Sequence, residues 1–81
     1  MIESRPIEEK IQIVRLLFEY EFRQLMTVKT ELRDRHRIVI TYGGLRSYSE
    51  RLRAQLRRKE PGAEWIVRKA LGEKEDQKTA G

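Results

Sequence analysis

The chain has 81 residues and a formal net charge of +5 at pH 7, a length for which we expect a single small domain over residues 1–72 and a disordered polar tail over residues 73–81. Because it contains no cysteine, disulfides, thiolate nucleophiles and cysteine-type zinc sites are excluded. We find neither a signal-peptide pattern nor an apolar stretch of the roughly 20 residues that span a bilayer, so we expect a cytoplasmic protein without membrane contact.

The first predicted element is a helix from about Pro6 to Leu25, since proline suits the first turn of a helix. Apolar side chains recur along it at spacings of three and four, on one face: Ile7, Ile11, Val14, Phe18, Phe22 and Leu25. Three more apolar residues, Ile13, Leu17 and Tyr20, lie off this stripe. They would be left in water, so we expect them to contact a partner or a second copy of the chain.

Residues 26–42 are ambiguous between strand and helix. Met26, Val28, Thr30 and Leu32 alternate as in a strand, and the run from Arg37 to Tyr42 is rich in β-branched residues. We favour a hairpin of these two segments, with a turn at residues 33–36. The alternative is a first helix that continues through Leu32, which would leave residues 38–42 to pair with another subunit.

Two further helices are predicted after Gly43 and Gly44. Ser47 and Glu50 have the spacing of a capping box, which favours a helix from about Tyr48 to Lys59. Pro61 should end that helix and begin the next, whose apolar face is formed by Ile66, Val67, Ala70 and Leu71, with Gly72 as its cap.

The predicted fold class is therefore α+β: helix, β-hairpin, helix, helix. The alternative is a mostly α protein with one long amino-terminal helix and an intersubunit strand. The expected order of helix, hairpin and helix, with residues 37–42 in the hairpin and 47–56 in the helix, resembles the small head-completion proteins of tailed phages. It is similar also to the carboxy-terminal part of the small dimerising subunit of the KEOPS tRNA-modification complex. Both resemblances imply a role in assembly rather than catalysis.

Positive charge is concentrated in one part of the sequence. Residues 33–59 contain nine arginines and lysines against Asp34 and Glu50 as the only acids. Arginine forks onto phosphate or carboxylate, so we expect a binding surface for nucleic acid or for an acidic protein. The predicted binding residues are Arg33, Arg35, Arg37, Arg46, Ser47, Arg51, Arg53, Arg57 and Arg58.

Catalytic chemistry is not indicated. His36 is the only histidine, and its position between arginines is typical of a solvated turn residue. No nucleophile and base, metal-ligand cluster or paired acid and base can be assembled. We therefore expect no enzyme activity, cofactor, metal or small-molecule substrate. The sequence predicts a basic, oligomeric binding module in a nucleic-acid-handling assembly, or alternatively an assembly subunit that binds an acidic protein through the same face.

Overall fold

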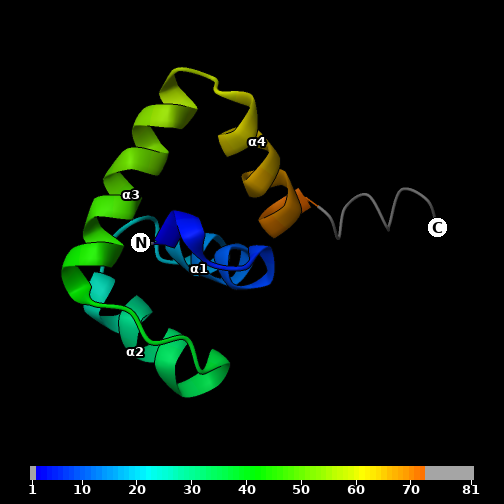
Figure 1. Cartoon of the computed structure of the whole chain (residues 1–81). Helices are drawn as coiled ribbons and strands as arrows, with labels where there is room; N and C mark the ends of the chain where they lie inside the picture. The colour runs from blue at the N-terminus through cyan, green and yellow to red at the C-terminus, as the bar shows by residue number, and fades with distance from the viewer. Residues whose placement is uncertain (1, 73–81) are drawn as a thin grey trace.

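The computed structural model describes residues 2–72, and this part of the chain is helical (Figure 1). Its α-helices are α1 (Ile7–Glu19), α2 (Leu25–His36), α3 (Tyr42–Arg57) and α4 (Pro61–Val67). A 3₁₀ turn, η1 (Ile2–Ser4), precedes them, and a π-helical turn, η2 (Arg68–Gly72), follows them. No β-strand occurs within residues 2–72, so the predicted α+β class is wrong.

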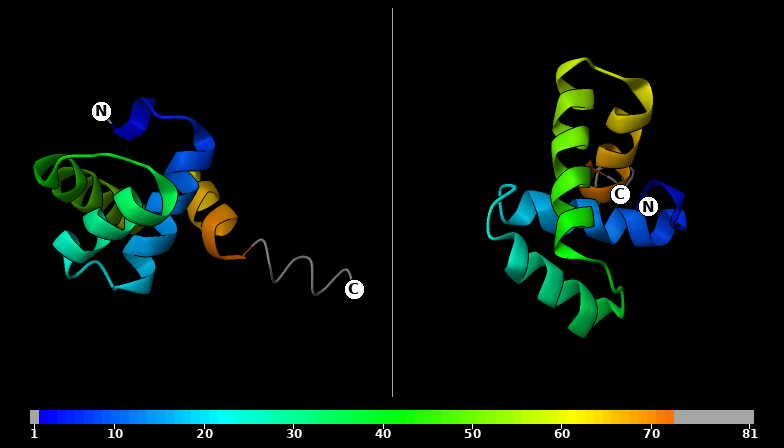
Figure 2. Two further views of the ribbon diagram at one scale, coloured as in Figure 1. Left: turned by 90° about the horizontal axis from the view of Figure 1, so that it is seen from below. Right: turned by 60° about the vertical axis from the view of Figure 1, so that its left-hand side comes forward.

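Helix α1 is the centre of the fold. It contacts α2 on one side and α4 with η2 on the other, while α3 contacts both α2 and α4 (Figures 1 and 2). Ile13, Val14 and Leu17 of α1 are completely buried, as are Val28 and Leu32 of α2 and Leu45 of α3. The helix is buried on two sides because its apolar residues cover more of its circumference than one stripe requires.

Helix α1 ends six residues earlier than the apolar spacing predicts. After Glu19 the backbone of Glu21, Phe22 and Gln24 adopts positive φ angles, which break the helix. Phe22 still packs edge to face on Phe18, with ring centroids 4.9 Å apart. The apolar spacing persists through a turn, which is why a sequence pattern cannot separate the turn from a longer helix.

The predicted hairpin is replaced by helix α2 and by a link, residues 37–41, that is neither helix nor strand. Val28 and Leu32, four residues apart, face the core together, and Thr27 and Thr30 are exposed on the opposite side. The predicted alternative is also wrong in part, because residues 26–32 are helical but belong to a helix separate from α1.

Burial of the side chains alternates along the link as it does along a β-strand, although the link is not paired with a strand within residues 2–72. Ile38 and Ile40 are buried, whereas Val39 between them is 69% exposed. Arg37, at the end of α2, has a left-handed backbone with φ of 58°. The alternation of buried and exposed side chains therefore indicates a locally extended backbone, which here packs on helices and not in a sheet.

Helix α3 begins at Tyr42, six residues before the predicted start. Thr41 is its N-cap, and the Thr41 side chain accepts a hydrogen bond of 2.9 Å from the Gly44 amide. The capping box at Ser47 and Glu50 is therefore wrong, because both residues lie inside the helix. Gly43 and Gly44 form its first turn, and a Cβ at Gly44 would come within 3.0 Å of the Thr41 hydroxyl.

Helix α4 begins at Pro61 as predicted, and Ala63, Ile66 and Ala70 face the core. Gly72 lies in the last π-helical turn. The tail predicted for residues 73–81 lies outside the described residues. The two family resemblances depended on a hairpin, and residues 2–72 contain none. No helix in this range is long and apolar enough to cross a membrane.

Candidate nucleic-acid interface

Helix α3 has one buried and one exposed face. Leu45, Tyr48, Ser49 and Leu52 are buried, which leaves the opposite side in solvent. Arg46, Glu50, Arg53 and Arg57 lie on that side at spacings of four, three and four, so they form a continuous line. We name these four residues the α3 stripe.

The arginines of the stripe make only weak, solvent-exposed contacts within the protein. Arg46 pairs with Glu50 at 3.4 Å, and both side chains are about two-thirds exposed, at 65% and 67%. The Arg53 guanidinium lies 5.3 Å from the ring centroid of Phe22, in the turn between α1 and α2. Among residues 2–72, Arg57 has no ion-pair partner. All three arginines can therefore reach a ligand in solvent.

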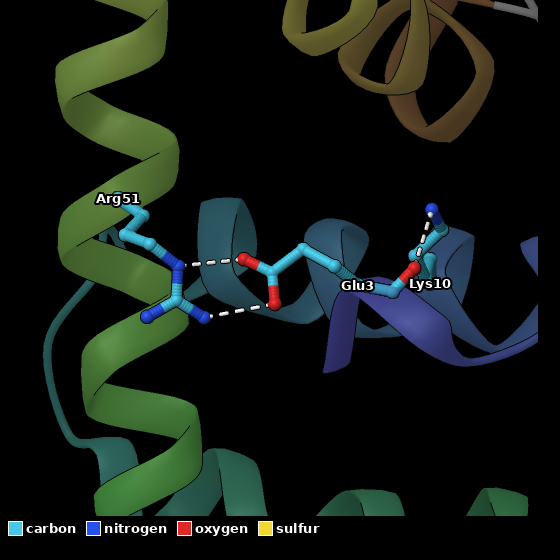
Figure 3. A network of polar contacts seen from close by, with 3 residues as sticks. All are labelled: Glu3, Lys10 and Arg51. Atoms are coloured by element: carbon cyan, nitrogen blue, oxygen red, sulfur yellow. Dashed lines mark hydrogen bonds and ion pairs between the residues drawn. The ribbon is translucent and has the colours of Figure 1, made fainter. Parts of the chain in front are cut away.

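Two other predicted arginines already have ion-pair partners, namely Arg51 in α3 and Arg58 just after its end. Arg51 donates to both carboxylate oxygens of Glu3, at 2.6 and 2.9 Å, across 48 residues of sequence (Figure 3). The hydrogen bond from Arg51 lowers the pKa of Glu3 below its usual value. Arg58 donates to Glu60 at 2.9 Å. The pair of Arg51 and Glu3 ties the amino-terminal turn η1 to α3, which is a structural role.

The arginines at the end of α2 are a separate group. Arg33 pairs with Asp34 at 2.9 Å, and Arg35 pairs with Glu31 at 3.3 Å. The carboxyl ends of α2 and α3 lie at opposite ends of the molecule (Figures 1 and 2). The predicted binding residues therefore do not form one surface, and Arg33, Arg35 and Arg37 lie outside the α3 stripe.

The three residues expected to contact a partner are placed differently. Ile13 and Leu17 are completely buried in the core of the chain itself. Tyr20 is half-buried, and its hydroxyl donates to Glu31 at 2.8 Å, which raises the pKa of Tyr20. Ile13 and Leu17 are not left in water, so the reason for expecting association through them does not hold.

Three residues of this surface have positions or contacts that were not predicted from the sequence. Ser47 is exposed on α3 beside the stripe instead of capping the helix, and Gly43 is exposed in the first turn of α3. Phe22 supports Arg53 from another element. The helical spacing of the α3 stripe is present in the sequence. A predicted helix start at Tyr48 left Arg46 outside the helix, so the four residues were not recognised as one line.

The described residues offer no metal site of three or more histidine and acidic side chains, and His36 is exposed at the end of α2. Comparisons of the chain with protein-family models, with curated proteins and with solved structures found no match.

Proposed function

We propose that the protein binds duplex DNA, with α3 in the major groove. The α3 stripe carries this proposal, because it places three exposed arginines along one side of a 16-residue helix. An α-helix fits the major groove of B-form DNA, where arginine can bind guanine with two hydrogen bonds. The major groove of A-form RNA is too narrow and deep for side chains to enter, so DNA is favoured over duplex RNA.

The arrangement of α2, link and α3 supports the proposal by analogy. In helix-turn-helix proteins a short turn joins two helices, and the amino-terminal residues of the second helix contact bases. Here α2 and α3 run at a steep angle to one another (Figure 1), joined by five residues that start with the left-handed Arg37. This link is longer than the usual turn of about three to four residues, and the analogy concerns layout alone.

The existing contacts of the stripe do not oppose DNA binding. An exposed ion pair such as Arg46 with Glu50 contributes about 0.2–1 kcal/mol. An exposed cation–π contact such as Arg53 with Phe22 contributes about 0.5–1 kcal/mol. Contacts with phosphate add a gain from counterion release, which at low salt exceeds these small costs. Both arginines can therefore exchange their partners for DNA.

Different roles follow for the two halves of α3. Arg46 and Ser47 lie near its amino-terminal end, the position from which side chains contact base edges, and the exposed Gly43 lets the backbone approach closely. Arg53 and Arg57 lie further along the helix. We assign them to the phosphate backbone, which positions the protein without sequence preference.

The test is fluorescence anisotropy with a labelled duplex of about two helical turns, roughly 20 base pairs, over a range of salt concentrations. The logarithm of affinity should fall with the logarithm of salt. The variant R53A/R57A should bind more weakly, with the slope reduced by about two units. R33A/R35A removes the same charge from the end of α2 and should change the slope far less.

Two results would count against the proposal. If R33A/R35A weakened binding as much as R53A/R57A, net charge alone would be responsible and α3 would not be the interface. If the parent protein did not bind duplex DNA even at low salt, the stripe would instead be assigned to an acidic protein partner, since arginine also forks onto carboxylates.

A further inference from the structure

A second candidate site lies on the link between α2 and α3 and reaches the first turn of α3. A groove of about 570 Å³ is formed there by apolar side chains from η1, the link and the first turn of α3, namely Ile2, Val39, Ile40 and Tyr42. Arg5 and Lys29 supply two positive charges at its wall. Neither the stripe nor the packing of the helices accounts for this combination. We name it the link groove.

The backbone of the link has unused hydrogen-bonding groups. Arg5 donates to the carbonyl of Val39, which occupies one edge of the extended segment. Within residues 2–72, neither the amide nor the carbonyl of Ile40 makes a hydrogen bond. Ile40 lines the groove, and a backbone amide and carbonyl that have no partner within the protein need one from outside it. Successive residues of an extended chain point their backbone groups to opposite edges, so those of Ile40 face away from Arg5.

We propose that the link groove binds an extended peptide segment of a partner protein in which acidic and aliphatic residues alternate. The peptide would pair its backbone with the amide and carbonyl of Ile40, as an added strand does at a sheet edge. Its aliphatic side chains would pack on Val39 and Tyr42, which are exposed at 69% and 42%. Its carboxylates would face Lys29, which lines the same groove.

The positive charge at the groove favours an acidic peptide over a second copy of this chain. A second copy of this chain, paired link to link, would bring its own Lys29 towards Lys29 of the first copy, and like charges disfavour that contact. Arg5 is already engaged with Glu9 at 2.9 Å, whereas Lys29 has no ion-pair partner among residues 2–72. Lys29 is therefore the main positive group available to an acidic peptide.

The test uses a blocked pentapeptide of alternating valine and glutamate, titrated into the isotopically labelled full-length protein and followed by NMR. We expect saturable shifts of the Val39 and Ile40 amide signals. N-methylation of the peptide on one backbone edge should abolish binding, and N-methylation on the other edge should not, because only one edge pairs with the link. A valine–lysine peptide should not bind.

The variant K29E should weaken binding of the valine–glutamate peptide by about tenfold, since a favourable charge pair becomes a repulsive one. K59E makes the same charge change just beyond the carboxyl end of α3 and serves as the matched control, with an expected change of less than about twofold. Circular dichroism of both variants establishes that they are folded.

Several outcomes would overturn the proposal. One is the absence of saturable shifts at Val39 and Ile40, and another is equal binding of the two N-methylated peptides. A free aliphatic carboxylate that saturated the same signals while the peptide did not would make this a small-molecule site. Light scattering that showed a dimer, with the Ile40 amide protected from exchange, would assign the groove to a second copy.

Discussion

Replacement of Thr41 by alanine should destabilise the protein, because Thr41 caps α3. Its hydroxyl accepts a hydrogen bond of 2.9 Å from the Gly44 amide, one of the helix-start amides that have no partner within the helix. Loss of a threonine N-cap costs about 1 kcal/mol, within a range of about 0.5–2. For a domain of this size, 1 kcal/mol lowers the melting temperature by about 4–8 °C.

Ser47 provides the matched comparison, since the sequence pattern assigns the cap to Ser47 and the structure assigns it to Thr41. Ser47 is exposed inside α3, and alanine is the better helix former. S47A should therefore leave stability unchanged or raise it by a few tenths of a kcal/mol, roughly the difference in helix propensity. T41S keeps the hydroxyl and should stay within about 0.5 kcal/mol of the parent.

The assay is urea unfolding followed by the helical circular dichroism signal, with equal m values required for a comparison of the free energies. A cost of about 1 kcal/mol for S47A together with no cost for T41A would contradict the role of Thr41, because it would place the start of the helix at Tyr48.

Three further predictions concern stability. Gly43→Ala should stabilise the protein by about 0.5–1 kcal/mol, since a Cβ at Gly43 meets nothing within 4 Å. Gly44→Ala should stabilise it less, because a Cβ there would lie 3.0 Å from the Thr41 hydroxyl. Urea unfolding compares the two variants, and an equal gain in stability would contradict the crowding at Gly44. Leu17→Ala should cost about 2–5 kcal/mol at every protein concentration, as expected for a side chain buried in a monomer core; a cost that depended on concentration would indicate an interface. Burial raises the pKa of Tyr48 from 10.0 to about 12. Between these pH values the unfolded state loses the phenol proton and the folded state keeps it. About 3 kcal/mol of stability that is present below pH 10 should therefore be lost as the pH rises to about 12. Tyr48→Phe should remove most of this loss in unfolding measured against pH, and an unchanged alkaline profile would contradict the assignment.

The amino- and carboxy-terminal helices could be predicted from local signals. Pro6 and Pro61 mark the starts of α1 and α4. The spacing of the apolar residues misplaced the buried face of α1, because Ile13 and Leu17, off the predicted stripe, are buried, whereas Ile7 on the stripe is only partly buried. The end of α1 could not be predicted, because Phe22 packs on Phe18 from a turn in which its backbone is left-handed.

The middle of the chain was misassigned because two periodicities overlap there. Val28 and Leu32 fit both an alternating strand and a helical face, and the β-branched Thr30 between them favoured the strand. Packing of α2 on α1 and α3 outweighs that weak preference. In the link, Ile38 and Ile40 alternate as strand residues do, but alternation indicates only an extended chain and gives no information about its partner.

The candidate site was predictable in composition but not in arrangement. The density of arginines identified α3 as basic. The ion pair of Arg51 with Glu3 joins residues 48 positions apart, and no local pattern indicates it. Which arginines remain available is thus a property of the tertiary fold, and the available set of α3 is reduced to Arg46, Arg53 and Arg57.

The most direct test of the proposed interface is NMR mapping of the labelled protein during titration with a short DNA duplex at low salt. We expect the largest shifts in the amino-terminal half of α3, at Gly43, Arg46 and Ser47, and at the Arg53 and Arg57 side chains. Signals of Arg33 and Arg35 should change little. Shifts concentrated at the end of α2, or the absence of any shift with duplex DNA, would contradict the assignment of α3 as the DNA-binding helix.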